Sequence, residues 1–270
     1  HGRGVWVLDD LTAVQQYTPS VNRTLTLFAP RPAFRWAHFA PINAFQDGLP
    51  QGDFTGPNVD YGVLLTYALP KPDKHATIDV LDSSGRVIRH LAGKDVPHKA
   101  GINRAAWDLN VEGPTKWHDT FEFNQGPNEG PEVVPGTYTI RVNANGTHVE
   151  QTAVVTRDPR DPLTAEQMEA RYDFMTELFR EYSIADRWLN EIDKRVKTRH
   201  STPALLAFKR ELTYNPRNVE DLSGPPGFRD RLGDLMGRMS GNYAPPTESQ
   251  INEANALRAM FDDLQKRQPH

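Results

Sequence analysis

The longest regular pattern in the sequence is a row of apolar residues that recurs every three or four positions between Met168 and Val196. This spacing places the row on one face of a single α-helix. Thr164 and Gln167 have the spacing of a capping box, so we expect the helix to begin there and to end near residue 199. A helix of roughly 50 Å, at 1.5 Å per residue, needs other helices to cover its apolar face.

Shorter helices are predicted after the long one. Thr202-Pro203 has the residue types of an N-cap and a first helical position, and the apolar residues of Phe228–Met239 repeat with a helical period. Thr247 and Gln250 form a second capping box, which opens a last helix whose apolar row begins at Ile251. These signals predict a C-terminal α-helical bundle over residues 163–268.

Upstream, between residues 61 and 157, the pattern changes to short alternating runs separated by turn residues. Asp82-Ser-Ser-Gly85 and Asn145-Gly146 are turn signals, and Trp107 is the best candidate for the centre of a core. Six or seven short strands at such intervals are typical of a β-sandwich.

Two phrases in this region carry a resemblance to a known family. Trp107-Asp108 and Pro135-Gly136-Thr137-Tyr138 follow each other in the order found in the immunoglobulin-like domains related to the flagellar hook-capping protein, and the similarity covers about 80 residues. The resemblance implies that residues 61–157 form an immunoglobulin-like β-sandwich. Residues 112–132, an acidic insert rich in Gly and Pro, are longer than the usual connection between the two phrases.

The first 60 residues contain few regular elements. Residues 5–8 alternate like one short strand but have no hairpin partner nearby, and a lone strand is not stable. We therefore expect the chain to be part of a longer protein that supplies the partner strands. The phrase Gly2–Asp10 resembles the end of the final blade in β-propellers of bacterial BNR-repeat, sortilin-like proteins. Residues 1–17 would then be the last propeller strand, and residues 18–60 a linker that packs on a neighbour.

The predicted helical region also resembles the C-terminal region of these sortilin-like proteins, which are often labelled glycosyl hydrolases. The resemblance implies a multidomain β plus α fold in an exported protein, periplasmic or extracellular. In that family a binding or catalytic pocket would lie on the propeller, outside these residues. We therefore expect a non-catalytic scaffold or interaction region whose partners are the upstream propeller and, through the bundle, a second copy of the chain.

The densest cluster of polar and aromatic side chains lies in the insert and comprises Trp117, His118, Asp119 and Glu122. One alternative function is a carbohydrate-binding module centred on residues 112–132, in which an exposed Trp117 stacks on a sugar and carboxylates bind its hydroxyl groups. Another alternative is part of a hydrolase whose active site lies on the propeller, with this insert reaching over it. The simplest interpretation is a solvated loop that packs on the propeller.

Composition and motifs exclude several other functions. Residues 1–160 carry 15 basic and 17 acidic side chains, and the remainder carries 16 basic and 18 acidic ones. Neither half therefore has the net positive charge that is typical of nucleic-acid binding. No apolar run approaches the roughly 20 residues of a membrane-spanning helix. The chain has no Cys, and its nine His form no closely spaced ligand pair. No P-loop or Gly-x-Ser-x-Gly motif occurs, and we expect no catalytic residues, metal or cofactor in this segment.

Overall fold

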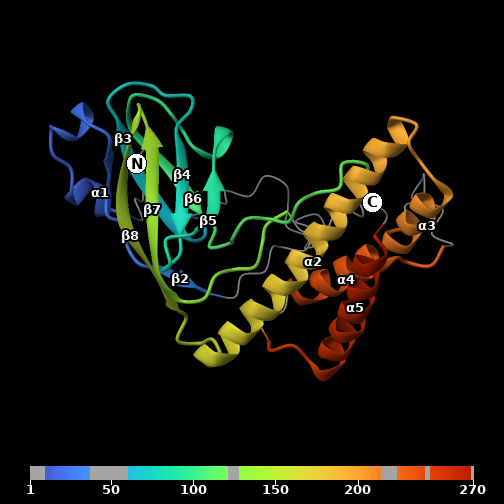
Figure 1. Ribbon diagram of the computed structural model, residues 1–270. Coiled ribbons are helices and arrows are strands. Elements are labelled where there is room, and N and C mark those ends of the chain that lie inside the picture. The colour runs from blue at the N-terminus through green and yellow to red at the C-terminus, as the bar shows by residue number, and fades with distance from the viewer. Residues whose placement is uncertain (1–9, 37–59, 121–127, 215–223, 241–243, 269–270) are drawn as a thin grey trace, which may run out of the picture. The chain divides into compact units, whose positions relative to one another are not determined.

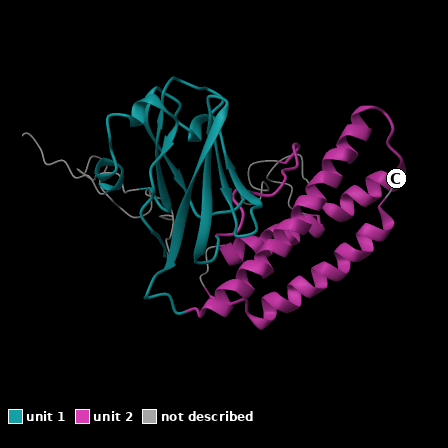
Figure 2. Cartoon of the chain, turned by 60° about the vertical axis from the view of Figure 1, so that its left-hand side comes forward, with its two compact units in different colours: residues 1–112, 133–162 teal, residues 113–132, 163–270 magenta. Residues whose placement is uncertain are grey.

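The computed structural model of the chain describes residues 10–36, 60–120, 128–214, 224–240 and 244–268 (Figure 1). The strand expected at residues 5–8, most of the expected linker and Glu122 lie outside these residues. The chain forms two compact units, coloured separately in Figure 2. Residues 1–112 and 133–162 form the β unit, and residues 113–132 and 163–270 form the helical unit. A β-sheet region followed by a C-terminal helical region was expected, and this coarse architecture is confirmed.

The described part of the β unit has two sheets, with strand orders β1-β3-β6 and β2-β8-β7-β4-β5. The strands are β1 (Thr26–Leu27), β2 (Ala33–Arg35), β3 (Val63–Leu69), β4 (Thr77–Leu81), β5 (Val87–Leu91), β6 (Gly101–Trp107), β7 (Gly136–Ala144) and β8 (Thr147–Arg157). A short helix, α1 (Thr12–Gln15), precedes them. Neighbouring strands pair antiparallel, except that β2 runs parallel to β8.

The two sheets share one hydrophobic core. All seven residues of β3 are buried, and Trp107 of β6 and Ile140 of β7 are fully buried in the same cluster. The ring of Trp107 meets that of Tyr138 edge-on, with 5.2 Å between the ring centroids. Trp107 therefore lies in the core of this unit, as the sequence predicted.

The tight turn between β7 and β8 follows from its two residues. Asn145 has φ 55° and Gly146 has φ 78°, and Ala144 pairs directly with Thr147. Positive φ at both central residues is the geometry that favours Asn-Gly in two-residue hairpins. The hairpin predicted from this dipeptide is confirmed.

The described part of the helical unit has four helices. They are α2 (Ala165–Lys197), α3 (Pro203–Leu212), α4 (Phe228–Ser240) and α5 (Glu248–Arg267). Thr164 and Thr247 each accept a hydrogen bond from the backbone N–H three residues later, and both predicted capping boxes are present. Thr202 caps α3 in the same way, with Pro203 at the start of the helix.

One hydrophobic core joins these helices, because α4 packs against both α2 and α5 and all four contribute buried side chains. The apolar row of α2 is buried from Met168 to Ile192 except at Tyr172, which is partly buried, and Val196 near the end of the helix is 38% exposed. On α5 the buried row begins at Ala254, and Ile251, which the sequence placed in the row, is 40% exposed. Among the described residues, no helix has both the length and the apolar character that crossing a membrane requires.

Candidate functional site

Residues 113–120, here named the strap, lie along α2 inside the helical unit. The sequence assigned this segment to the β-sandwich because it lies between two strands of that region. Three backbone N–H groups of the strap instead donate hydrogen bonds to side chains of α2. The donors are Thr115 to Ser183 Oγ (3.1 Å), Trp117 to Asp186 Oδ2 (2.9 Å) and His118 to Asn190 Oδ1 (2.9 Å). Asn190 also donates to the carbonyl of Lys116 at 2.8 Å, so one polar face of α2 holds the strap.

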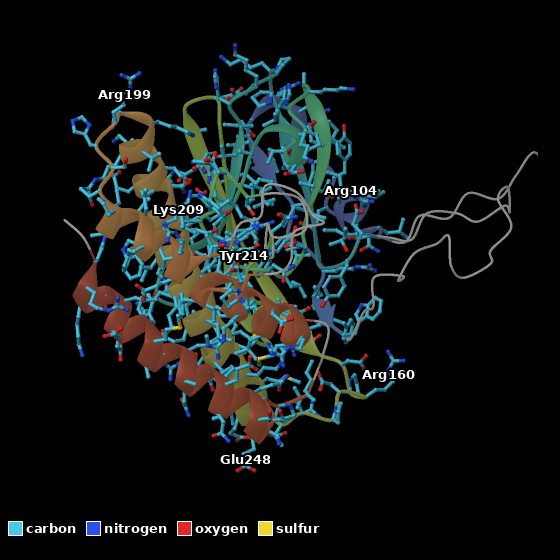
Figure 3. The ribbon with its side chains drawn as sticks, turned by 90° about the vertical axis from the view of Figure 1, so that its right-hand side faces the viewer. Arg104, Arg160, Arg199, Lys209, Tyr214 and Glu248 are labelled. Carbon is cyan, nitrogen blue, oxygen red and sulfur yellow. The ribbon has the colours of Figure 1, made fainter. Side chains whose placement is uncertain are left out.

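Trp117 is part of the core of the helical unit. Its side chain is 1% exposed, and its indole Nε1 donates a 2.6 Å hydrogen bond to Asp193 Oδ2. The guanidinium of Arg229 lies 5.5 Å from the Trp117 ring centroid and the Nζ of Lys209 (Figure 3) lies 5.1 Å from it. These contacts correct the expectation of an exposed sugar-stacking ring, because the ring faces that would receive a sugar are already covered.

The charges around Trp117 are paired inside the unit. Asp186 and Arg229 are both 0% exposed and contact each other through Oδ1 and Nε. Burial raises the pKa of Asp186 above its ordinary 3.8, and the contact with Arg229 opposes that shift. Asp193 in turn contacts Lys209 of α3. Two carboxylates of α2 thus join the strap to α3 and α4.

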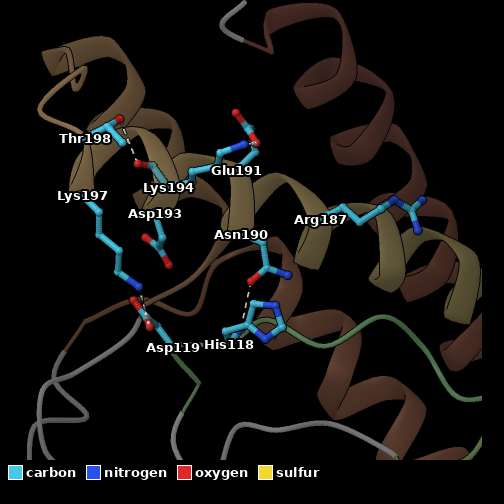
Figure 4. A pocket seen from close by; sticks show the side chains of 9 residues that line it. All are labelled: His118, Asp119, Arg187, Asn190, Glu191, Asp193, Lys194, Lys197 and Thr198. Carbon is cyan, nitrogen blue, oxygen red and sulfur yellow. Dashed lines mark hydrogen bonds and ion pairs between the residues drawn. The ribbon is translucent and has the colours of Figure 1, made fainter.

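An open pocket of about 600 Å³ lies next to these buried groups (Figure 4). Two of its lining residues, His118 and Asp119, come from the strap. The others come from α2 and from the residue that caps its C-terminus, and are Arg187, Asn190, Glu191, Asp193, Lys194, Lys197 and Thr198. Of the four candidate ligand-binding residues, His118 and Asp119 line this cavity, Trp117 lies in the core of the helical unit, and Glu122 lies outside the described residues.

Most of the charged groups of this pocket neutralise one another. Lys197 Nζ lies 3.5 Å from Asp119 Oδ1, and Lys194 Nζ lies 4.0 Å from Glu191 Oε2. These four side chains are between 46% and 75% exposed, so each pair contributes little to stability. The hydroxyl of Thr198 donates to the carbonyl of Lys194 at 3.0 Å and lies 3.2 Å from Nδ1 of His200. The pocket offers hydrogen bonds and exposed charged groups to a polar solute.

The remaining acidic residues of the insert are dispersed. Glu112 lies in the β unit, where its carboxylate accepts a hydrogen bond from the backbone N–H of His90 at 3.0 Å. Glu129 and Glu132 belong to the helical unit but do not line the pocket. Among the described residues, no group of three or more His, Asp or Glu side chains is placed to hold a metal ion.

Sequence reasoning missed the polar residues that organise this region. Asp186 and Asp193 lie seven residues apart on α2 and are 0% and 7% exposed. Together with the buried Tyr182 and Leu189 they continue the spacing of three and four residues that marks the buried face. A carboxylate at a buried position of a helix requires a cation or an N–H group as its partner. The two acidic residues on the buried face of α2 were therefore the sequence signal from which this region could have been found.

Comparisons with known proteins add little to these observations. No family model and no curated protein matches the chain. Among solved structures, the chain has a likeness to CopC from Methylosinus trichosporium OB3b, with 19% sequence identity and a TM-score of 0.20. The matched region covers 37% of this chain and 80% of that chain. A likeness at this TM-score carries no conclusion about the fold or the ligands of this chain.

Proposed function

We propose that this chain is a non-catalytic scaffold and interaction region of a larger exported protein. One observation carries the proposal, namely that the deeply buried charges around Trp117 are used to hold the strap. Buried ionisable groups are the usual candidates for catalysis. Here Asp186 is occupied by Arg229 and the Trp117 backbone, and Asp193 by Lys209 and the Trp117 indole.

The finer proposal for the β unit is an immunoglobulin-like sandwich. The order β1-β3-β6 matches strands A, B and E of that fold, and β8-β7-β4-β5 matches G, F, C and an added C′. The hydroxyl of Tyr138, near the start of β7, donates a 2.7 Å hydrogen bond to the carbonyl of Val134. A tyrosine at this place, bonded to the backbone a few residues upstream, is the tyrosine corner of immunoglobulin-like domains.

The proposed parent is a BNR-repeat, sortilin-like protein with an upstream β-propeller. Its support is the resemblance of the phrase Gly2–Asp10 and of the helical region to that family, together with the proposed sandwich. In this proposal the β unit braces the propeller, and the helical unit offers a surface to a second copy of the chain.

The parent and the partner are tested on protein isolated from its natural source. Intact mass spectrometry and light scattering would measure which polypeptide carries this sequence and what accompanies it. We expect a β-propeller, joined covalently or retained as a partner. A free monomer of 30.5 kDa with no propeller would contradict the proposal.

The non-catalytic part is tested by incubating the full chain with a set of p-nitrophenyl glycosides. We expect no release of nitrophenol above the buffer rate. Turnover that disappears in Asp193→Asn while circular dichroism remains unchanged would show that the carboxylates of α2 catalyse hydrolysis, and would overturn the proposal.

A further inference from the structure

The tight turn between β7 and β8 carries a reactive dipeptide. Asn145-Gly146 is the one Asn-Gly pair in the sequence. Asn-Gly is prone to spontaneous deamidation, because glycine has no side chain that would hinder its own amide nitrogen. In this reaction the nitrogen of Gly146 attacks Cγ of Asn145, and ammonia leaves. The cyclic imide that forms then takes up water and opens to an aspartyl or an isoaspartyl residue.

The surroundings of Gly146 leave room for this reaction. Gly146 is exposed, and a Cβ atom there would meet no atom within 4 Å among the described residues. Asn145 is only partly buried. Steric shielding therefore does not protect the turn, and any protection must come from the bonds that Asn145 itself makes.

Asp73 makes the bonds that hold Asn145. Its Oδ2 accepts hydrogen bonds from the backbone N–H of Asn145 at 2.6 Å and from the side-chain Nδ2 at 3.2 Å. One carboxylate oxygen thus fixes the backbone and the side chain of Asn145 together. The amide oxygen of Asn145 is buried and has no hydrogen-bond partner among the described residues. In this position it has no donor to stabilise the negative charge that it gains during the attack.

Asp73 is itself held in the loop between β3 and β4. Its backbone N–H donates to the carbonyl of His98 at 3.1 Å, and its carbonyl accepts from Ala76 at 3.0 Å. Its Oδ1 accepts from the backbone N–H of His75 at 3.0 Å. Hydrogen bonds from the backbone of Asn145 and of His75 lower the pKa of Asp73 below the ordinary 3.8. The carboxylate is therefore ionised at neutral pH, and its bonds to Asn145 are of the stronger, charge-assisted kind.

We propose that Asn145 is a site of spontaneous deamidation and that Asp73 is the residue that restrains it. Closure of the imide ring requires the side chain of Asn145 to rotate until Cγ meets the nitrogen of Gly146. This rotation breaks the side-chain bond to Asp73, so the reaction must wait for the contact to open.

The products of the reaction do not suit the turn. An aspartyl residue at position 145 places a second carboxylate against that of Asp73. An isoaspartyl residue adds one atom to the backbone of a two-residue turn in which Ala144 pairs directly with Thr147. Because the released ammonia is lost, each modification would loosen the hairpin of β7 and β8 irreversibly.

The test is prolonged incubation of the full chain at mildly alkaline pH, followed by trypsin digestion and mass spectrometry. The tryptic peptide 142–157 contains Asn145 and also Asn143, which is followed by Ala144 and serves as the internal reference. The same peptide made by synthesis gives the rate without Asp73. We expect Asn145 to deamidate at least about tenfold more slowly in the folded chain than in the peptide, equivalent to about 1.4 kcal/mol.

A pair of variants assigns this protection to Asp73. Asp73→Ala should raise the rate at Asn145 in the folded chain by about tenfold. Asp82→Ala is the matched control, because Asp82 also accepts hydrogen bonds from backbone N–H groups of a turn, those of Ser84 and Arg86, but makes no bond to Asn145. It should leave the rate unchanged. Circular dichroism checks that both variants are folded.

Several outcomes would overturn the proposal. Equal rates in the folded chain and the peptide would mean that Asn145 is not restrained. An unchanged or slower rate in folded Asp73→Ala would remove Asp73 from this role, and faster modification of Asn143 than of Asn145 would remove the site. If Asp73→Ala does not fold, Asp73→Asn replaces it, because an amide keeps an acceptor oxygen but loses the charge. Asp73→Asn should raise the rate by a smaller factor, and an unchanged rate would again contradict the proposal.

Discussion

The indole Nε1 of Trp117 donates a hydrogen bond to Oδ2 of Asp193, 2.6 Å away, across 76 positions of sequence. The donor lies in a segment between two strands of the β unit, and the acceptor lies on α2. The second oxygen of Asp193 contacts Lys209 on α3. The core of the helical unit is therefore completed by a residue that comes from outside its helices, and its stability should depend on that residue.

The first prediction is that Trp117→Ala strongly destabilises the helical unit. The substitution removes a fully buried ring and leaves Asp193 without its indole donor. Truncation of large aromatic residues in cores costs about 3–5 kcal/mol. The measurement is urea unfolding followed by far-ultraviolet circular dichroism, which is dominated by the helices.

Two further variants separate packing from hydrogen bonding. Trp117→Phe keeps most of the ring but removes the N–H, so we expect a cost of about 1–3 kcal/mol for the unpaired buried acceptor. Leu206→Ala on α3 is the surface control and should change stability by no more than about 0.5 kcal/mol, because Leu206 is 36% exposed. Equal stability of Trp117→Ala and Leu206→Ala would contradict the buried position of Trp117.

The second prediction concerns the buried pair of Asp186 and Arg229. Arg229→Met leaves the carboxylate of Asp186 buried without its cation, and breaking such pairs costs about 3–5 kcal/mol. The loss should shrink at acidic pH, because burial already raises the pKa of Asp186 and the unpaired group then takes up a proton more readily. Urea unfolding at neutral and acidic pH measures both effects.

Arg238→Met is the matched control for this pair. Arg238 of α4 binds Asp234 and Glu253 at 2.9 and 2.7 Å, but its side chain is 47% exposed. Exposed pairs contribute about 0–1 kcal/mol, so the control should be close to the unmodified chain. If both variants lose the same stability at neutral pH, the buried pair has no special role.

The helices of this protein could be predicted because their signals are local. The capping boxes at Thr164 and Thr247 and the apolar row of α2 require only neighbours within one or two turns. The Asn145-Gly146 hairpin is equally local, since both residues take the positive φ that their types favour. The sequence did not predict that Ile251 is exposed, because a helical period carries no information on where the helix that packs against that face ends.

The site was predictable only in part, for a physical reason. Trp117 and His118 were singled out by residue type, but their partners on α2 lie about 70 positions later, and no local pattern specifies that contact. A segment between two strands was assigned to the sheet region, whereas hydrogen bonds to Asp186 and Asn190 place it in the helical unit. The two carboxylates on the buried face of α2 were a signal in the sequence that this helix needs a polar partner.

The third prediction tests the proposed tyrosine corner. Tyr138→Phe removes the hydroxyl that donates to the Val134 carbonyl and keeps the ring that packs on Trp107. We expect a loss of about 0.5–1.5 kcal/mol in the β unit. Thermal unfolding followed by near-ultraviolet circular dichroism measures it, with Tyr17→Phe, whose ring is 43% exposed, as the neutral control. An unchanged transition would remove this support for the immunoglobulin-like assignment.

The fourth prediction compares two glutamates of α2 that differ in burial. Glu181 is 0% exposed, and burial raises its pKa above the ordinary 4.5 although Arg258 of α5 lies 3.4 Å away. Glu177 is held by hydrogen bonds from Arg180, which lower its pKa below 4.5. The two groups should therefore affect stability with opposite dependence on pH.

The signs follow from proton binding in the folded and unfolded states. Above pH 4.5 the folded chain holds the Glu181 proton longer than the unfolded chain does, so its contribution to stability is lost as pH rises through the folded pKa. Glu177 contributes stability above pH 4.5 that is lost as pH falls through its lowered pKa. Glu181→Gln should thus raise stability at neutral pH, and Glu177→Gln should lower it slightly. Urea unfolding of both variants from acidic to neutral pH measures these effects. If Glu181→Gln loses more stability than Glu177→Gln at neutral pH, the pairing of Glu181 with Arg258 outweighs the cost of its burial, and the prediction is wrong.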